Sequence, residues 1–304
     1  MSQTEIRDAL RPAVVTKVTP QTLLQSKRAS TPLTALTAYD YPTARLADES
    51  GIDVILVGDS VGTAVLGYDN TLSVTMDDML HHARAVRRGT QRALLVVDMP
   101  YGSYQVSVED AVRNGLHFFK EGRSEAIKLE GGIAYTPHVK ALTQAEMPVV
   151  GHIGLTPQSI HRMGGYRVQG LSEAAAMRLR EDALALEDAG AIALVLEGIP
   201  RELAAQITDS LSIPTIGIGA GPDCDGQILV FHDLFSLSFT RKPKFVRSFG
   251  NARLLVEQGI CDFRNAVVAR TFPDDRESYH MPKAEVAAER YGTSIEQKEV
   301  TACK

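Results

Sequence analysis

Short apolar stretches recur along the chain at intervals of roughly 25–40 residues. They are rich in Val, Ile and Leu, and most are apolar at nearly every position instead of alternating with polar residues. This pattern is typical of strands in a parallel sheet that is covered on both faces. We predict eight strands, which lie within residues 33–40, 54–60, 93–100, 126–132, 148–155, 191–200, 213–221 and 244–250.

Amphipathic stretches with helical spacing separate the predicted strands. The clearest are residues 42–51, 107–122, 172–190 and 251–270. Ser107, followed by Asp110, and Ser172, at the head of an Ala- and Leu-rich run, are typical helix N-caps.

Eight strands that alternate with helices predict a (β/α)8 TIM barrel. We expect residues 1–304 to form a single barrel domain, with a polar lead-in over residues 1–25 and a polar tail over about 284–304. No predicted strand is followed directly by GxGxxG, so a doubly wound nucleotide-binding sheet has little support.

Composition narrows the class of protein. The chain has 32 Lys and Arg against 37 Asp and Glu, which argues against a generally basic nucleic-acid binder. Cys224, Cys261 and Cys303 form no CxxC pair, and their odd number suits a reducing compartment. The apolar runs are too short to span a bilayer, and the first residues do not resemble a secretory signal. We expect a cytoplasmic protein with no nucleic-acid or membrane partner.

Carboxylates follow several of the predicted strands. Asp59 and Ser60 come after the second strand, Asp98 ends the third, and Glu130 ends the fourth. Barrel enzymes place their chemistry at this end of the strands, where converging acids would repel each other unless a cation lay among them. Oxygen donors favour a hard ion such as Mg²⁺. The alternative is that each aspartate only caps the next helix.

Three further polar residues are candidates for chemistry. Lys128 shares its strand face with Glu130, so the two either form an ion pair or leave the lysine to bind a substrate carboxylate. Glu197 follows a run of five apolar residues and suits a general base, unless it lies in a solvated loop. His152 lies within a strand, where a histidine is more often part of the core than a catalyst.

Several motifs follow one another along the chain. They are TAYDYP at 37–42, VGDSVG at 57–62, DMPYGSYQ at 98–105, AIKLEGG at 126–132, GHIGLTPQS at 151–159, GGYRVQG at 164–170, LEGIP at 196–200 and IGIGAGPDCDGQILVFHD at 216–233. Together they resemble one known family, that of ketopantoate hydroxymethyltransferase (3-methyl-2-oxobutanoate hydroxymethyltransferase). The resemblance covers roughly residues 15–275 and is specific because the motifs occur jointly and in order.

The resemblance implies a barrel of the phosphoenolpyruvate/pyruvate type and a homo-oligomer, a decamer by analogy with the family. It implies transfer of a hydroxymethyl group from 5,10-methylenetetrahydrofolate to 3-methyl-2-oxobutanoate through an enolate stabilised by Mg²⁺. The product would be 2-dehydropantoate, on the route to pantothenate.

The resemblance also assigns roles to residues. Asp59 and Asp98 would bind the metal and, through it, the substrate, with Glu130 as an outer carboxylate of the metal site. Lys128 and Ser60 would contact the substrate, and Glu197 would accept its proton. Apart from the resemblance, we expect His152 at most to support these groups without contacting metal or substrate. Two alternatives remain, another Mg²⁺-dependent barrel lyase that acts on a 2-oxo acid and a catalytically silent barrel.

Overall fold

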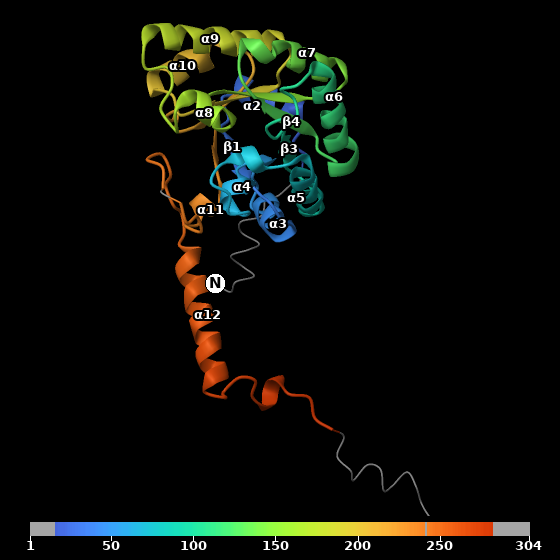
Figure 1. The fold of residues 1–304 in the computed structure, drawn as a ribbon, viewed down its shortest axis with the longest axis vertical. Coiled ribbons are helices and arrows are strands. Elements are labelled where there is room, and N and C mark those ends of the chain that lie inside the picture. The colour runs from blue at the N-terminus through green and yellow to red at the C-terminus, as the bar shows by residue number, and fades with distance from the viewer. Residues whose placement is uncertain (1–15, 241, 282–304) are drawn as a thin grey trace, which may run out of the picture. The chain divides into compact units, whose positions relative to one another are not determined.

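Eight parallel strands close into a barrel in the order of the sequence, with β8 pairing with β1. The structure is a computed structural model that describes residues 16–240 and 242–281 (Figure 1). The strands are β1 (Leu33–Thr37), β2 (Val54–Val57), β3 (Leu94–Asp98), β4 (Ala126–Glu130), β5 (Val149–Gly154), β6 (Ala193–Glu197), β7 (Thr215–Ile218) and β8 (Gly226–Leu229). The predicted barrel is therefore confirmed.

Seven of the predicted strands are found where the pattern places them, and the eighth prediction is wrong. Residues 244–250 form turns and bends, and β8 lies at Gly226–Leu229 instead. This strand begins with a glycine because a Cβ at residue 226 would lie 2.6 Å from the carbonyl oxygen of Leu33. Gly-Gln-Ile-Leu is a weak apolar signal, whereas Phe245, Val246 and Phe249 imitate one.

Helices follow most strands and surround the barrel (Figure 1). The α-helices are α2 (Pro20–Arg28), α3 (Tyr41–Glu49), α4 (Val61–Ala64), α5 (Met76–Gly89), α6 (Val108–His117), α7 (Thr136–Gln144), α8 (Ile160–Met163), α9 (Glu173–Asp188), α10 (Arg201–Ser210), α11 (Phe231–Leu234) and α12 (Ala252–Val268). Both predicted caps are present. Ser107 accepts a hydrogen bond from the backbone N–H of Asp110, and Ser172 accepts one from that of Ala175.

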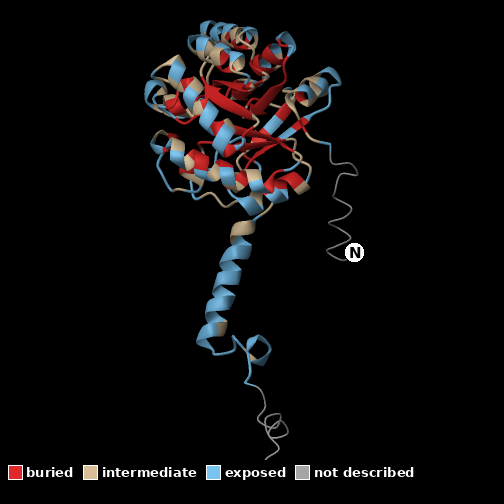
Figure 2. Ribbon diagram, turned by 90° about the vertical axis from the view of Figure 1, so that its right-hand side faces the viewer, coloured by how far each residue is buried: buried red, intermediate tan, exposed pale blue. Residues whose placement is uncertain are grey.

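The chain divides into two compact units, Met1–Asn251 and Ala252–Lys304. The first contains the barrel. The second contains α12, whose apolar side chains are exposed (Figure 2). The prediction that this helix belongs to the barrel stays a prediction, and the tail over 284–304 lies outside the described residues. In the described part of the chain, no helix is long and apolar enough to cross a membrane.

Two apolar cores hold the barrel together, and the strands between them are buried (Figure 2). One lies between the strands and the outer helices, and the other fills the barrel interior. Val18 and Leu23, which are 2% and 1% exposed, belong to the interior core. The described part of the expected polar lead-in is therefore packed structure, while residues 1–15 lie outside the described residues.

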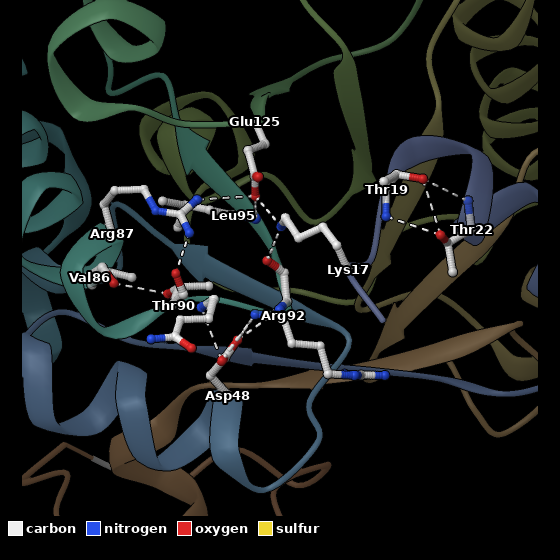
Figure 3. Close-up of polar contacts among 12 residues, drawn as sticks. Lys17, Thr19, Thr22, Asp48, Val86, Arg87, Thr90, Arg92, Leu95 and Glu125 are labelled. Atoms are coloured by element: carbon white, nitrogen blue, oxygen red, sulfur yellow. Dashed lines mark hydrogen bonds and ion pairs between the residues drawn. The ribbon is translucent and has the colours of Figure 1, made fainter. Parts of the chain in front are cut away.

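A polar network lies where the chain enters β3 (Figure 3). Asp48, on α3, accepts hydrogen bonds of 2.7–3.1 Å from the backbone N–H groups of Gln91, Arg92 and Ala93. The Lys17 ammonium contacts the Glu125 carboxylate at 2.6 Å and the Ala93 carbonyl oxygen at 2.7 Å. These contacts satisfy buried backbone groups and fix the start of β3, which carries Asp98 at its other end.

We predict that Asp48→Asn lowers the free energy of unfolding by about 2–4 kcal/mol. Both carboxylate oxygens accept backbone N–H groups, so the new amide would point a donor at a donor. Denaturant unfolding measures the change. Asp188→Asn is the control, because Asp188 is exposed and its loss should change stability by less than about 0.5 kcal/mol. Equal stability of the two variants would contradict the assigned role.

Candidate active site at the carboxyl ends of the strands

Alternate residues of each strand point into the barrel, and this series changes from apolar to polar toward the carboxyl ends of the strands. In β3 the inward-facing residues are Leu94, Val96 and Asp98, and in β4 they are Ala126, Lys128 and Glu130. In β5 they include Val150 and His152, and in β6 they are Ala193, Val195 and Glu197. The fold therefore brings these five predicted site residues to one mouth of the barrel.

Asp59 and Ser60 reach the same mouth from the turn after β2. A Cβ at Gly58 would lie 2.8 Å from Ser60 Oγ, so glycine leaves the space that this turn needs. The backbone N–H of Asp59 donates to Asp98 Oδ2 at 3.1 Å, and Ser60 Oγ lies 2.8 Å from the Tyr39 hydroxyl. The Asp59 side chain does not cap α4, whose N-cap position is Ser60.

Charged side chains form a continuous line across the mouth. The Lys128 ammonium lies 3.0 Å from Asp98 Oδ1 and 3.3 Å from His152 Nδ1. His152 Nδ1 lies 3.3 Å from Glu130 Oε1, and its Nε2 lies 3.3 Å from Glu197 Oε2. Lys128 thus pairs with Asp98, and the histidine joins two glutamates.

Glu197 differs from the other members of this line in its exposure. Its side chain is 16% exposed, whereas those of Asp98, Lys128, Glu130 and His152 are 3–6% exposed. Among these five groups, Glu197 is therefore the one best placed to meet a substrate from solvent.

The two aspartates are the least stabilised anions of the cluster. Burial raises the pKa of Asp59 well above its usual value, and repulsion by Asp98 and Glu130 adds to the effect. Burial also raises the pKa of Asp98, and the nearby Lys128 offsets this only in part. Both aspartates are therefore short of positive charge.

Lys128, Glu130 and His152 stabilise one another as ions. Burial lowers the pKa of Lys128, but attraction to Asp98 and Glu130 outweighs it and raises that pKa above its usual value. Burial raises the pKa of Glu130, yet contacts with His152 and Lys128 leave it below its usual value. For His152, burial and the charge of Lys128 lower the pKa, but contacts with Glu130 and Glu197 outweigh them and raise it to about 9.

The donor set fits a divalent cation at the two aspartates. Asp98 Oδ1 is buried 3.0 Å from the ammonium of Lys128, and among the described residues no other donor contacts it. Asp59 and Asp98 are both buried, and Lys128 offsets the cost for Asp98 only in part, so a divalent cation at the two aspartates would supply the missing positive charge. Oxygen donors of this kind suit Mg²⁺, which is typically held by one or two carboxylates together with water and substrate oxygens.

Glu130 is not placed as a third direct ligand. Within residues 16–240 and 242–281, no three His, Cys, Asp or Glu side chains converge on a point that could hold a metal ion. Glu130 Oε2 instead accepts the backbone N–H of Gln158 at 3.0 Å, and its Oε1 faces His152. This placement suits an outer role for Glu130.

Sequence reasoning missed Gln158, which touches several members of the site. Its side-chain amide donates to Asp59 Oδ2 at 2.8 Å and to the Met99 carbonyl oxygen at 3.0 Å. Its Oε1 accepts from the Tyr104 hydroxyl at 2.7 Å. Gln158 lies in a short 3-10 helix after β5 (Pro157–Ser159), and its signals in the sequence are its place after a strand and within the motif GHIGLTPQS.

Comparison with solved structures shows the fold class, a closed (β/α)8 barrel. Phosphonopyruvate hydrolase, solved with oxalate and Mg²⁺, aligns with a TM-score of 0.54 at 16% identity, over 89% of this chain and 93% of that one. A 2,3-dimethylmalate lyase, which is a member of the phosphoenolpyruvate mutase/isocitrate lyase superfamily, aligns with a TM-score of 0.53 at 18% identity, over 86% and 91%. At such low identity these similarities show the fold alone.

Sequence comparison then shows the family. Residues 17–275 match the sequence model of ketopantoate hydroxymethyltransferase. The 3-methyl-2-oxobutanoate hydroxymethyltransferase of Koribacter versatilis is 58% identical, covering 88% of this chain and 90% of the relative. That of Geobacter sulfurreducens is 55% identical, covering 81% and 92%. The chain belongs to the ketopantoate hydroxymethyltransferase family, which confirms the resemblance found in the sequence.

We predict that, in metal-free protein, the His152 imidazole stays protonated through neutral pH and loses its proton near pH 9. Its folded pKa lies above the unfolded value of about 6.5, so its contribution to stability is fully present below pH 6.5 and is lost as the pH rises toward 9. Nitrogen NMR of labelled histidine measures the titration, with His152→Gln identifying the signal. A midpoint at or below 6.5 would show that the two glutamates do not hold the charge.

Proposed function

We propose that the protein transfers a hydroxymethyl group from 5,10-methylenetetrahydrofolate to 3-methyl-2-oxobutanoate and releases 2-dehydropantoate, a precursor of pantothenate. Membership of the family supports the reaction. The observation that carries the proposal is the line of charged groups at the barrel mouth, which ends in the partly exposed Glu197. A silent barrel would have no need to bury so many charges, because each is costly to remove from water.

Asp59 and Asp98 would hold Mg²⁺ in this proposal. When bound, the ion supplies a Lewis acid that polarises the 2-oxo acid and stabilises negative charge on its oxygen atoms. Lys128 contributes a buried positive charge next to Asp98, and Ser60 contributes a hydroxyl that is held by Tyr39. These two groups would orient the substrate carboxylate.

Glu197 would act as the general base. It would take the proton from C3 of 3-methyl-2-oxobutanoate, while His152 holds its Oε2 from the buried side. The resulting enolate carbon forms a carbon–carbon bond to the one-carbon unit of the folate, water supplies the hydroxyl group of the product, and the two bonds from that carbon to the folate nitrogens break. The proton taken from C3 and the second proton of the water end on the two folate nitrogens, which gives tetrahydrofolate. The folate provides the electrophile, and the protein provides orientation and proton transfer.

Product analysis tests the proposal. Purified protein is incubated in D2O with 3-methyl-2-oxobutanoate, 5,10-methylenetetrahydrofolate and Mg²⁺, with a chelator control, and followed by NMR. We expect 2-dehydropantoate to form only in the presence of Mg²⁺. Deuteration at C3 without product would point to a different electrophile, and neither signal from folded protein would refute the assignment.

We predict that Glu197→Gln lowers kcat by at least about 100-fold, because removal of a general base typically costs 10²–10⁴-fold. The amide keeps the shape of the side chain but cannot accept the proton. Calorimetry should show Mg²⁺ and 3-methyl-2-oxobutanoate binding close to those of the unmodified protein. Full activity of the variant would exclude Glu197 as the base.

We predict that Asp98→Asn weakens Mg²⁺ binding by at least about 10-fold, because a neutral amide replaces a charged oxygen ligand. Calorimetric titration of the metal-free protein measures the affinity. Glu202→Gln, an exposed acid in the first turn of α10, controls for a general change in charge. An unchanged affinity in Asp98→Asn would remove Asp98 from the metal site.

The same proposal includes a homo-oligomer, a decamer by analogy with the family, that works in the cytoplasm. The described cysteines, Cys224 and Cys261, are both free thiols, which suits a reducing compartment. Mass photometry of the purified protein determines the number of subunits.

A further inference from the structure

Gln158 joins the two sides of the carboxylate cluster through three donated hydrogen bonds. Its side-chain amide donates to Asp59 Oδ2 and to the Met99 carbonyl oxygen, and its backbone N–H donates to Glu130 Oε2. The residue is 7% exposed, so these bonds form away from bulk water. Hydrogen bonds from donors to buried carboxylates are among the stronger ones in proteins.

The orientation of the Gln158 amide is fixed from the far side by Gln105. Gln105 Oε1 accepts the backbone N–H of Gly102 at 2.7 Å, so its NH2 group must face Gln158. That group donates to Gln158 Oε1 at 3.1 Å, and the Tyr104 hydroxyl donates to the same oxygen at 2.7 Å. Because its oxygen receives two donors, the NH2 group of Gln158 must point toward Asp59.

These contacts form a relay of hydrogen bonds from the backbone N–H of Gly102, in the loop after β3, through Gln105 and Gln158 to the Asp59 carboxylate. Each amide in it presents oxygen on one side and N–H on the other, and reversing either one would bring two acceptors together. The relay stabilises negative charge on Asp59 without adding a positive charge. A lysine at this place would add one. One oxygen of Asp59 is thereby bound, which leaves the other for a cation.

We propose that Gln158 is a positioning residue for the cation ligand Asp59, and that Gln105 sets the orientation of its amide. The inference rests on the proposed role of Asp59 in the Mg²⁺ site. Neither glutamine touches the reacting atoms in this account. They act by holding the charge and direction of the carboxylate, as groups behind a metal ligand commonly do.

The test measures Mg²⁺ affinity by calorimetry of the metal-free full-length protein, together with thermal stability. Gln158→Met keeps the length of the side chain but removes its donor and acceptor. We expect Mg²⁺ to bind about 10- to 100-fold more weakly. Thr208→Val is the matched control, because it removes a buried 2.7 Å contact with Thr215. Thr215 is the first residue of β7, at the end of the strand away from the carboxylates. We expect this control to lower stability and leave the affinity unchanged.

A pair of variants at Gln105 tests the relay without altering any group that touches Asp59. Gln105→Glu still accepts from Gly102 but turns an acceptor toward Gln158 Oε1, which favours reversal of the Gln158 amide. Gln105→Met removes the donor to Gln158 Oε1 and the acceptor of the Gly102 N–H, but it turns no acceptor toward Gln158 and leaves Tyr104 to hold the Gln158 amide in place. We therefore expect Gln105→Glu to weaken Mg²⁺ binding at least 10-fold and Gln105→Met to weaken it by less than 3-fold, on the order of the loss of one neutral hydrogen bond or less.

The outcomes separate this inference from the proposed function. If the unmodified protein binds Mg²⁺ and forms product but the Gln158 variant binds the ion equally well, the positioning role is wrong and the function stands. Equal effects of the two Gln105 variants would likewise overturn the relay. If the unmodified protein itself fails to bind Mg²⁺, the metal site of the proposed function fails first.

Discussion

The structure depends on one unfavourable arrangement, the burial of several carboxylates around a single lysine at the mouth of the barrel. Asp59, Asp98 and Glu130 are almost fully buried, and Lys128 lies against Asp98. Removing such charges from water costs several kcal/mol each unless partners compensate. Lys128 and His152 supply part of this compensation, and the amide of Gln158 adds hydrogen bonds without adding charge. A divalent cation would neutralise the negative charge that these partners leave uncompensated.

The rest of the fold makes this arrangement possible by holding the strands rigidly. The interior apolar core lies below the charged layer, and the network around Asp48 fixes the entry to β3. Gly154 shows how closely the strand ends approach, since a Cβ there would lie 2.2 Å from the carbonyl oxygen of Glu197. Its φ of +96° is also one that side chains disfavour. Glu197 and His152 are thus carried by two strands in direct contact.

The sequence predicts the site where strand geometry alone controls it. Asp98, Lys128, Glu130, His152 and Glu197 could be placed because they end or continue apolar strands and share the inward-facing parity. Asp59 could be expected from its place just after β2. Their position at one mouth is now visible, whereas their roles in binding and catalysis remain proposals.

The features that sequence reasoning missed lie in segments where the spacing of apolar residues gives little signal. Gln158 lies in a 3-10 helix of only three residues, and its importance comes from contacts with residues far away in the sequence, such as Asp59 and Tyr104. β8 is short and begins with a glycine that the neighbouring strand requires, so its apolar signal is weak. Leu23 belongs to a polar stretch, yet it packs into the interior core of the barrel.

We propose that the two aspartates complete their charge balance with a divalent cation that meets the substrate at the barrel mouth. Crystals grown with Mn²⁺ in place of Mg²⁺ and with 3-methyl-2-oxobutanoate would locate the ion by its anomalous scattering. We predict one Mn²⁺ in direct contact with Asp59 and Asp98. The 2-oxo acid should lie between this ion and Glu197. An ion elsewhere, or substrate bound at the mouth with no ion at the aspartates, would contradict it.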